Sequence, residues 1–273
     1  VMLGHELTLN PFYTTPSYQE LESLSFDDKI GVLKQPEMRA RILSEAVDPD
    51  PTKVLGRLVR EFDHMFLLGD PPDSEQPFDP SSRALAQRAG VPPEELGYDL
   101  MLERDGHNML YVTLCNYAYG SVESSLAMMR HPGAVLGLGD GGAHCGTICD
   151  GSFPTFMLSY WVRDRTRGER LSLSETVRML SRDAARAVGL EDRGVIAPGY
   201  KADLNVIDLD QLRLYAPEVA HDLPTGGRRL VQRADGYCAT IVSGRIVHRN
   251  GSDTGELPGR LVRGPQAAPP KMH

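Results

Sequence analysis

Apolar positions in the first hundred residues recur with the period of amphipathic helices. One such set spans 54–66 and predicts a single helix there. Its members are Val54, Leu55, Leu58, Val59, Phe62, Met65 and Phe66. The next segment, 69–80, contains repeated prolines that remove hydrogen-bond donors, so we expect a loop. Pro92 then opens a second helix that extends to about Glu103, because proline and acidic residues favour the first helical turn.

Two strand-like runs flank a short helix in the middle of the chain. The runs are 109–115 and 134–138. The segment 121–129 between them is expected to be a helix capped by Ser121. A strand, a helix and a second strand at this spacing predict a βαβ unit with parallel strands. The second run leads into a Gly-Asp-Gly-Gly sequence that holds Asp140.

The pattern changes from helical to strand-like in the last third of the chain. A helix is expected over 174–188. Beyond it, 203–208 alternates between apolar and polar residues, as a half-buried strand does. The runs 239–242 and 245–248 flank Ser243-Gly244, which predicts a tight hairpin. The last third is therefore expected to form a β-rich unit of its own.

Composition narrows the classes of function. The 273 residues include 29 Lys and Arg against 37 Asp and Glu, and the resulting net charge of −8 argues against nucleic-acid binding. No apolar run approaches the roughly 18 residues of a membrane-spanning helix, so no membrane partner is expected. The 4 cysteines do not suggest a disulfide framework, and reduced thiols in a cytoplasmic protein are the prediction.

Asp140 occupies the position at which parallel α/β proteins place reacting groups. The carboxyl ends of parallel strands meet where loops converge. Glycines on both sides of Asp140 leave the backbone open to a substrate or a metal. A carboxylate there can bind a divalent metal and take a proton from its bound water. A turn aspartate that accepts bonds from nearby amides explains the same pattern, and the residues alone leave both interpretations open.

Two histidines are candidates for substrate binding. His144 follows Asp140 by four residues, in the same expected loop. His5 lies in the N-terminal apolar run 1–9, and its side chain lines the same site if that run is a barrel strand. A histidine in a strand is otherwise a structural residue, and that alternative stays open for His5.

The remaining metal-binding residue types show no recognised spacing. The chain contains neither His-x-His nor His-Glu-x-x-His. Cys145 and Cys149 have three residues between them and no second pair, which argues against a structural zinc site. The charged run 163–170 is interpreted as solvated surface. Five further histidines have no polar constellation around them in the sequence. They are His64, His107, His131, His221 and His248.

A glycine pattern around Asp140 suggests a different class of protein. Gly137, Gly139 and Gly142 fit G-x-G-x-x-G, and Asp164 falls where a ribose-binding acid would lie. That fingerprint must open a helix whose N-terminus holds a pyrophosphate. Two glycines and a proline within 146–154 interrupt such a helix, so an NAD-dependent oxidoreductase is the less favoured alternative.

Three stretches together resemble a known family. The chain is similar to the N-acyl-D-amino-acid deacylase (D-aminoacylase) branch of the amidohydrolase superfamily over most of 95–264, and more weakly at its start. The first stretch, Val135–His144, resembles the last barrel strand and its catalytic aspartate. The second, Ser152–Phe156 with Tyr160–Asp164, resembles the segment that follows that strand. The third, Asp192–Asp208 with Ala239–Val247, resembles the chain where it enters the β-sandwich.

The resemblance implies a fold and a reaction. The implied fold is α/β, the C-terminal part of a (β/α)8 barrel plus strands of a β-sandwich domain. The implied enzyme is a hydrolase of non-peptide C–N bonds that acts on an N-acyl amino acid or a related small amide. One or two zinc ions activate a hydroxide, and Asp140 inherits the role of proton shuttle and possible metal ligand.

Two departures from the family pattern limit what is carried over. The family's His-x-His and its later Cys and His ligands have no counterpart here. We therefore expect a fragment that needs a complementary N-terminal half of the barrel and is inactive alone. The loop 143–150 also lacks the arginine by which D-aminoacylase holds the substrate carboxylate. The resemblance thus implies amide hydrolysis as a class, and it leaves the stereospecificity open.

The resemblance also assigns the segments of the chain. They are a barrel strand at 1–9, an inserted helical and loop subdomain at 10–93, the last barrel strands and helices at 94–190, β-sandwich strands at 191–264 and a flexible tail at 265–273. A non-catalytic subunit or pseudo-enzyme fragment, in which Asp140 is structural, is the main alternative.

Overall fold

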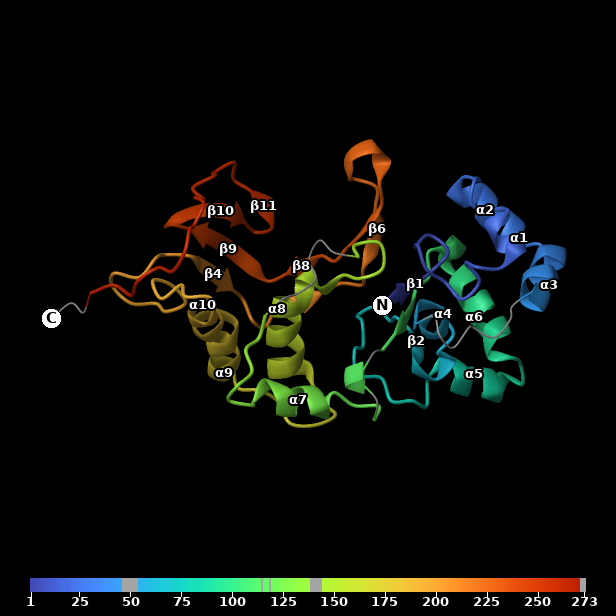
Figure 1. Cartoon of the computed structure of the whole chain (residues 1–273), viewed down its shortest axis with the longest axis horizontal. Coiled ribbons are helices and arrows are strands. Elements are labelled where there is room, and N and C mark those ends of the chain that lie inside the picture. Colours follow the sequence, from blue (N-terminus) through green and yellow to red (C-terminus); the bar gives the residue numbers. More distant parts are fainter. Residues whose placement is uncertain (46–53, 114, 118, 138–143, 271–273) are drawn as a thin grey trace. The chain divides into compact units, whose positions relative to one another are not determined.

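The computed structural model describes residues 1–45, 54–113, 115–117, 119–137 and 144–270 (Figure 1). The chain forms two compact units, each assembled from segments that are not contiguous in sequence. The first comprises 1–124, 142–149 and 216–231, and the second comprises 125–141, 150–215 and 232–273. The fold is of the mixed α/β class.

The helices of the first unit are short, and several have clear end signals. Ser25 caps α2 by accepting a hydrogen bond from the Asp28 amide at 3.2 Å, as serine does at many helix starts. Gly90 ends α5 in the left-handed conformation, with φ of 71°. The helices are α1 (Pro16–Gln19), α2 (Phe26–Leu33), α3 (Pro36–Glu45), α4 (Val54–Leu58), α5 (Ser82–Ala89) and α6 (Pro93–Leu102), with 3-10 turns η1 (Phe62–His64), η2 (Arg104–Gly106), η3 (Cys115–Tyr117) and η7 (Pro224–Gly226).

Three strands form a small antiparallel sheet in the first unit. They are β1 (Met2–Leu3), β2 (Met65–Leu67) and β3 (Leu110–Val112), in the order β1-β3-β2. The prediction of a strand within 109–115 is confirmed by β3. The prediction that this strand pairs in parallel is wrong. Both of its neighbours run antiparallel, with Met2 opposite Tyr111 and Met65 opposite Val112. The predicted N-terminal strand is likewise limited to β1.

The predicted single helix over 54–66 is also wrong. The helix α4 ends at Leu58, and the chain enters β2 at Met65. Met65 packs in the main core of the unit, whereas Phe66 packs with Tyr111 and Tyr117 in a second cluster. Both faces of β2 are thus buried. Consecutive apolar residues in such a strand match the helical period by coincidence.

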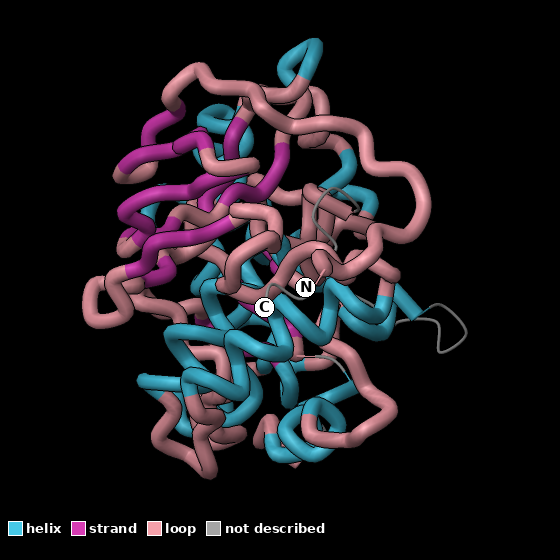
Figure 2. Tube along the Cα trace, turned by 90° about the vertical axis from the view of Figure 1, so that its left-hand side faces the viewer, coloured by secondary structure: helices cyan, strands magenta, loops and turns pink. Residues whose placement is uncertain are grey.

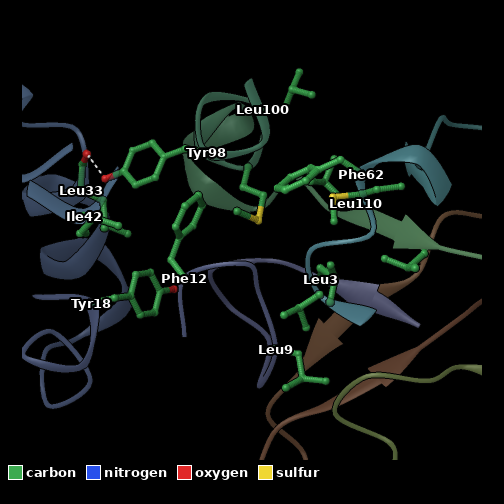
Figure 3. Close-up of a cluster of buried hydrophobic side chains, with 14 of the residues drawn as sticks. Leu3, Leu9, Phe12, Tyr18, Leu33, Ile42, Phe62, Tyr98, Leu100 and Leu110 are labelled. Atoms are coloured by element: carbon green, nitrogen blue, oxygen red, sulfur yellow. Dashed lines mark hydrogen bonds between the residues drawn. The ribbon is translucent and has the colours of Figure 1, made fainter. Parts of the chain in front are cut away.

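The core of the first unit joins the N-terminal segment to the helices (Figure 3). Phe12 and Tyr98 meet edge to face with ring centroids 5.2 Å apart, and the Tyr98 hydroxyl donates to the Leu33 carbonyl at 2.8 Å. The buried members of this cluster are Leu3, Leu9, Phe12, Tyr18, Leu21, Ile30, Leu33, Ile42, Val59, Phe62, Met65, Tyr98, Leu100, Met101, Leu110 and Val112. The segment 1–12 is therefore part of the core of this unit.

A hairpin from late in the sequence completes the first unit. Its strands β6 (Glu218–Ala220) and β7 (Arg229–Val231) pair antiparallel. Leu230 is buried in a small cluster with Leu7 and Met109. Residues 216–231, which the sequence assigns to the sandwich segment, thus pack against the start of the chain.

The helices after position 150 alternate between α and π geometry. The expected helix over 174–188 is confirmed as α9 (Leu173–Arg178), a π segment η6 (Met179–Asp183) and α10 (Ala184–Ala187). Gly189 follows with φ of 76°, as a helix C-terminus often requires. The preceding elements are η4 (Asp150–Ser152), α8 (Phe153–Phe156) and the π segment η5 (Met157–Asp164). Earlier in the chain, α7 (Glu123–Met129) lies within the helix predicted over 121–129.

The β-rich character predicted for the last third is confirmed in the second unit. A four-stranded antiparallel sheet has the order β11-β10-β9-β4, and its strands lie side by side in Figure 2. Ser243 and Gly244 have φ of 51° and 78°, the double positive φ of a type I′ hairpin turn. The strands are β4 (Leu204–Ile207), β9 (Tyr237–Val242), β10 (Arg245–Arg249) and β11 (Ser252–Asp253), and the separate pair β5 (Arg213–Leu214) and β8 (Ala234–Asp235).

Three further expectations are corrected in the described residues. Residues 134–137 form no strand; the Ala134 amide bonds to the His131 carbonyl in a turn, and the exposed Val135 has no ladder partner. Arg165 is not solvated, with only 1% of its surface exposed. The expected flexible tail is tied at Gln266, whose amide bonds to the Gly189 carbonyl and whose carbonyl accepts from the Glu191 amide.

Candidate functional site

The predicted catalytic residue falls in a segment that the structure does not describe. Asp140, the proposed proton shuttle and possible metal ligand, lies within 138–143, outside the described residues. The residues directly after this segment form a turn at 144–148 and not a helix. A dinucleotide-binding fingerprint requires a helix at that place, so this turn disfavours the oxidoreductase alternative.

His144 begins this turn with its side chain exposed. Its φ of 52° is left-handed, and its carbonyl accepts hydrogen bonds from the amides of Thr147 and Ile148 at 2.8 and 3.0 Å. The backbone of His144 therefore closes the turn, and the imidazole is directed to solvent. Its role in substrate binding stays a prediction.

Backbone bonds and close packing fix the turn to the first unit. The Met2 amide donates to the Thr147 carbonyl at 2.8 Å, and the Leu230 amide donates to the Cys145 carbonyl at 2.6 Å. Gly146 lies so close to Thr8 that a Cβ at this position would be 2.9 Å from the threonine hydroxyl oxygen. The turn that begins at His144 is therefore held beside the N-terminal segment.

His5 lies in that N-terminal segment, but its ring is turned into the core. Only 1% of its surface is exposed, and Nδ1 lies 3.1 Å from the Tyr18 hydroxyl oxygen. The ring also stacks on Tyr18 and meets the edge of Tyr98. Burial, aided by the charge of Lys29, lowers the pKa of His5 to about 3, so the imidazole is neutral at physiological pH. This environment fits the structural alternative, and a substrate contact by His5 stays a hypothesis.

A lysine beside His5 was not found from the sequence. The Lys29 ammonium donates to the His5 carbonyl at 2.9 Å and lies 4.6 Å from the centre of the Tyr18 ring. Burial, together with the charge of Arg228, lowers the pKa of Lys29 to about 8. No local pattern marks Lys29, because its partners come from another segment of the chain.

Glu6 joins two histidines to which the sequence assigned no constellation. The Oε2 atom of Glu6 lies 2.8 Å from Nδ1 of His107, and the Oε1 atom lies 3.5 Å from Nε2 of His221. The Glu6 side chain is 15% exposed, whereas both histidines are more than half exposed. The interpretation that His107 and His221 stand alone is therefore wrong. The two contacts join residues far apart in sequence, so spacing gave no signal.

The predicted zinc site can be tested only against the described residues. Among them, no group of three or more His, Cys, Asp or Glu side chains is arranged to hold a metal ion. His107 lies at ordinary hydrogen-bond distance from Glu6, which leaves no space for an ion between them. The described residues thus do not themselves form a zinc site.

A family comparison bears directly on the whole chain. A model described as the amidohydrolase family matches residues 3–248. The chain belongs to the amidohydrolase family. The family predicted from Val135–His144 and the two later stretches is confirmed by this match. None of the helices in the described part of this amidohydrolase combines the length and apolar character that a membrane span requires.

Individual relatives of this amidohydrolase cover only part of it. A 5-methylthioadenosine/S-adenosylhomocysteine deaminase of Desulfitobacterium hafniense is 35% identical over 37% of the chain and 23% of its own length. An imidazolonepropionase of Paracoccus denitrificans is 32% identical over 54% of the chain and 38% of its own length. The chain thus spans less than two fifths of the relatives it matches.

The chain also resembles solved structures of D-aminoacylase. One of them, studied for the role of its binuclear metal centre, is 20% identical, with a TM-score of 0.38 over 70% of this chain and 36% of that one.

Proposed function

We propose that this chain supplies the proton-transfer carboxylate, Asp140, to a metal-dependent amide hydrolase of the N-acyl-amino-acid deacylase type. The observation that carries the proposal is the amidohydrolase match over residues 3–248, which spans the segment of Asp140. The position of Asp140 between glycines, next to an anchored turn, supports the same role. A carboxylate in that position can accept a proton and return it to a leaving nitrogen.

The substrate proposed is a small N-acyl amino acid or a related amide. The exposed imidazole of His144 is four residues from Asp140 and is available to contact a polar group of such a substrate. His5 is retained as a second candidate for this contact, although its ring faces Tyr18 in the described fold.

The cofactor proposed is one or two zinc ions, which supply a Lewis acid for amide hydrolysis when bound. Because the described residues do not form the site, we propose that most ligands come from a complementary N-terminal half of the barrel. The (β/α)8 barrel, the β-sandwich and the segment boundaries at 9, 93, 190 and 264 belong to this proposal.

The test is a substitution in the complete assembly of the chain with its complementary half. The asparagine side chain of Asp140→Asn has the size of the aspartate, but it cannot accept a proton at neutral pH and return it. We expect hydrolysis of a panel of N-acyl amino acids to fall by about two to four orders of magnitude. The matched control is Asp150→Asn, because Asp150 is an exposed residue of η4.

Two outcomes decide against the proposal. Turnover by Asp140→Asn equal to that of Asp150→Asn removes Asp140 from the reaction. A zinc-loaded assembly that hydrolyses none of the amides favours the non-catalytic or pseudo-enzyme alternative. Metal content, measured by elemental analysis after chelation and zinc addition, separates the loss of a ligand from the loss of a proton-transfer group.

A further inference from the structure

The hairpin of β6 and β7 is held on the first unit by apolar packing and by a backbone hydrogen bond. Leu230 packs in the apolar cluster of the N-terminal segment, and its amide donates to the Cys145 carbonyl at 2.6 Å. This bond joins the hairpin, residues 216–231, to the turn that begins directly after 138–143. A change in how the hairpin is held therefore reaches that turn.

A carboxylate of the N-terminal segment contacts the hairpin and a second element at once. The Oε1 atom of Glu6 lies 3.5 Å from Nε2 of His221, which directly follows β6. The Oε2 atom lies 2.8 Å from Nδ1 of His107, which directly follows η2. Both imidazoles are more than half exposed, so solvent protons reach them. Glu6 thus lies between two side chains of the type that changes charge between about pH 5 and 8.

The two contacts of Glu6 differ in kind. At 2.8 Å, the His107 ring can donate a hydrogen bond to the carboxylate whether it is neutral or protonated. The Phe26 ring, 4.8 Å away, packs against the same imidazole. At 3.5 Å, the His221 contact is longer than the roughly 3.2 Å of an ordinary hydrogen bond, so its attraction depends on charge. Loss of the His221 proton therefore removes that attraction and leaves the His107 bond.

The other charged groups on the surrounding elements do not titrate as histidine does. Asp222 of the hairpin is bound by Arg229 at 2.7 Å, and Asp105 of η2 is bound by Lys34 at 3.0 Å. The remaining groups are Lys29 of α2, which donates to the His5 carbonyl and has a pKa of about 8, Glu103, which accepts from the Asn108 side chain, Arg104 and Arg228, which are cations, and His5, whose ring stays neutral.

We propose that Glu6 and His221 form a pH-dependent latch, in which protonated His221 fastens the hairpin 216–231 to the N-terminal segment and deprotonated His221 loosens it. His107 holds the Glu6 carboxylate in place in both states. The stabilisation is present at acidic pH and is lost as the pH rises, because only the protonated imidazole attracts the carboxylate. The proposal does not rest on the proposed amide hydrolysis, since every contact in it joins described residues of the first unit.

The test is hydrogen–deuterium exchange of the whole chain at about pH 5.5 and 7.5, on either side of the usual histidine value. Labelling times are scaled to the intrinsic exchange rate at each pH. Pepsin peptides within 216–231 report the opening of the hairpin. We expect their protection to be roughly two- to fivefold lower at the higher pH, which is the factor that one exposed ion pair provides. Peptides from α9, which contains no histidine, should show no such difference.

Three variants separate the charge from the shape of the side chains. His221→Gln removes the charge at both pH values, so the hairpin should show the lower protection at both. His221→Lys keeps a positive charge at both, so protection should stay high at both. His107→Gln retains a neutral donor for Glu6 and should keep most of the pH dependence.

Equal protection of the hairpin at the two pH values in the unsubstituted chain overturns the latch. A pH difference that persists at full size in His221→Gln or His221→Lys also overturns it, because another group must then titrate. If His221→Gln also lowers protection in β3, the substitution has disturbed the whole unit. The comparison of His221→Lys with the unsubstituted chain then decides.

Discussion

The hydroxyl oxygen of Tyr18 lies 3.1 Å from Nδ1 of His5 and accepts a hydrogen bond from the side-chain amide of Asn10 at 2.9 Å. The Tyr18 hydroxyl therefore takes part in two buried hydrogen bonds, one with the Asn10 side chain and one with the His5 ring. The three side chains are buried and fix the start of the chain in the core of the first unit. Their bonds lead to two predictions.

Tyr18→Phe should lower the free energy of unfolding by about 1–3 kcal/mol, because it leaves buried polar atoms of Asn10 and His5 without their partner. Urea unfolding measures the change. Tyr13→Phe is the control, since Tyr13 is only partly buried and packs at the edge of the same core. Equal effects of the two substitutions would show that the Tyr18 hydroxyl contributes nothing specific.

The pH dependence of stability should include a contribution from His5. Its pKa is about 3 in the folded chain against about 6.5 when unfolded. Between these values the unfolded state binds more protons, so the free energy of unfolding rises with pH. The contribution of His5 to the free energy of unfolding is complete above about pH 6.5. It decreases on acidification, by up to about 1.4 kcal/mol per pH unit. His5→Gln should flatten this slope in urea titrations between about pH 4 and 7, whereas His248→Gln at an exposed site should not.

Local patterns were read correctly where a few adjacent residues determine the structure. The hairpin at Ser243-Gly244 depends on a two-residue turn and the alternation on either side of it. The helix α6 depends on Pro92 and the acidic residues of its first turn. Both were predicted because their signals lie within the element itself.

Distant contacts explain what the sequence did not predict. The strand β2 lies where a helix was expected, because Met65 pairs with Val112 across 47 positions of sequence. Glu6 and His107 meet across 101 positions. Neither pairing produces a periodic pattern of residues in the sequence, so each contact is found only in the folded structure. For the candidate site, the family could be inferred from sequence and Asp140 could be proposed from it, but the anchoring of the turn at His144 could not.

Two glycine substitutions should change stability in opposite directions. Gly244 has φ of 78°, so Gly244→Ala places a side chain in the left-handed region at a cost of about 1–2 kcal/mol. Gly31 lies inside α2, and a Cβ there meets no atom within 4 Å. Gly31→Ala should therefore increase stability by about 0.5–1 kcal/mol. Urea unfolding of the two variants tests both signs. A stabilising Gly244→Ala would contradict the type I′ turn.

The buried arginine of the second unit should be sensitive to substitution. Arg165 donates to the Glu169 carbonyl at 2.6 Å, and its guanidinium lies 4.6 Å from the centre of the Trp161 ring. Arg165→Met keeps much of the apolar stem but leaves the carbonyl without its donor. We expect a loss of about 1–3 kcal/mol in urea unfolding.

A lysine at this position tests the geometry of the guanidinium. Arg165→Lys keeps the charge but not the planar fork, so it should not restore the stability lost in Arg165→Met. Arg186→Met at an exposed position of α10 is the control and should change stability by less than about 0.5 kcal/mol. Full stability of Arg165→Lys would show that charge alone matters at this site.

Asp203 should make the second unit sensitive to acid. Its Oδ1 atom accepts from the Ser243 amide at 2.8 Å, and its Oδ2 atom accepts from the Lys201 ammonium at 2.7 Å. Burial alone would raise the pKa of Asp203, but the bonds from Lys201 and the Ser243 amide outweigh it and hold the pKa below its usual value. The carboxylate thus stabilises the fold above its unfolded pKa, and this contribution is lost as the pH falls through the folded pKa.

Asp203→Asn removes the charge but keeps an oxygen for the Ser243 amide. It should lower the free energy of unfolding by about 1–3 kcal/mol near neutral pH, since hydrogen bonds to charged groups are the stronger ones. The difference from the unsubstituted chain should shrink as the pH falls through the folded pKa of Asp203, because both side chains are then neutral. Asp210→Asn, at an exposed residue, controls for the general effect of lost charge. A difference for Asp203→Asn that is independent of pH would mean that the carboxylate stabilises the hairpin by shape and not by charge.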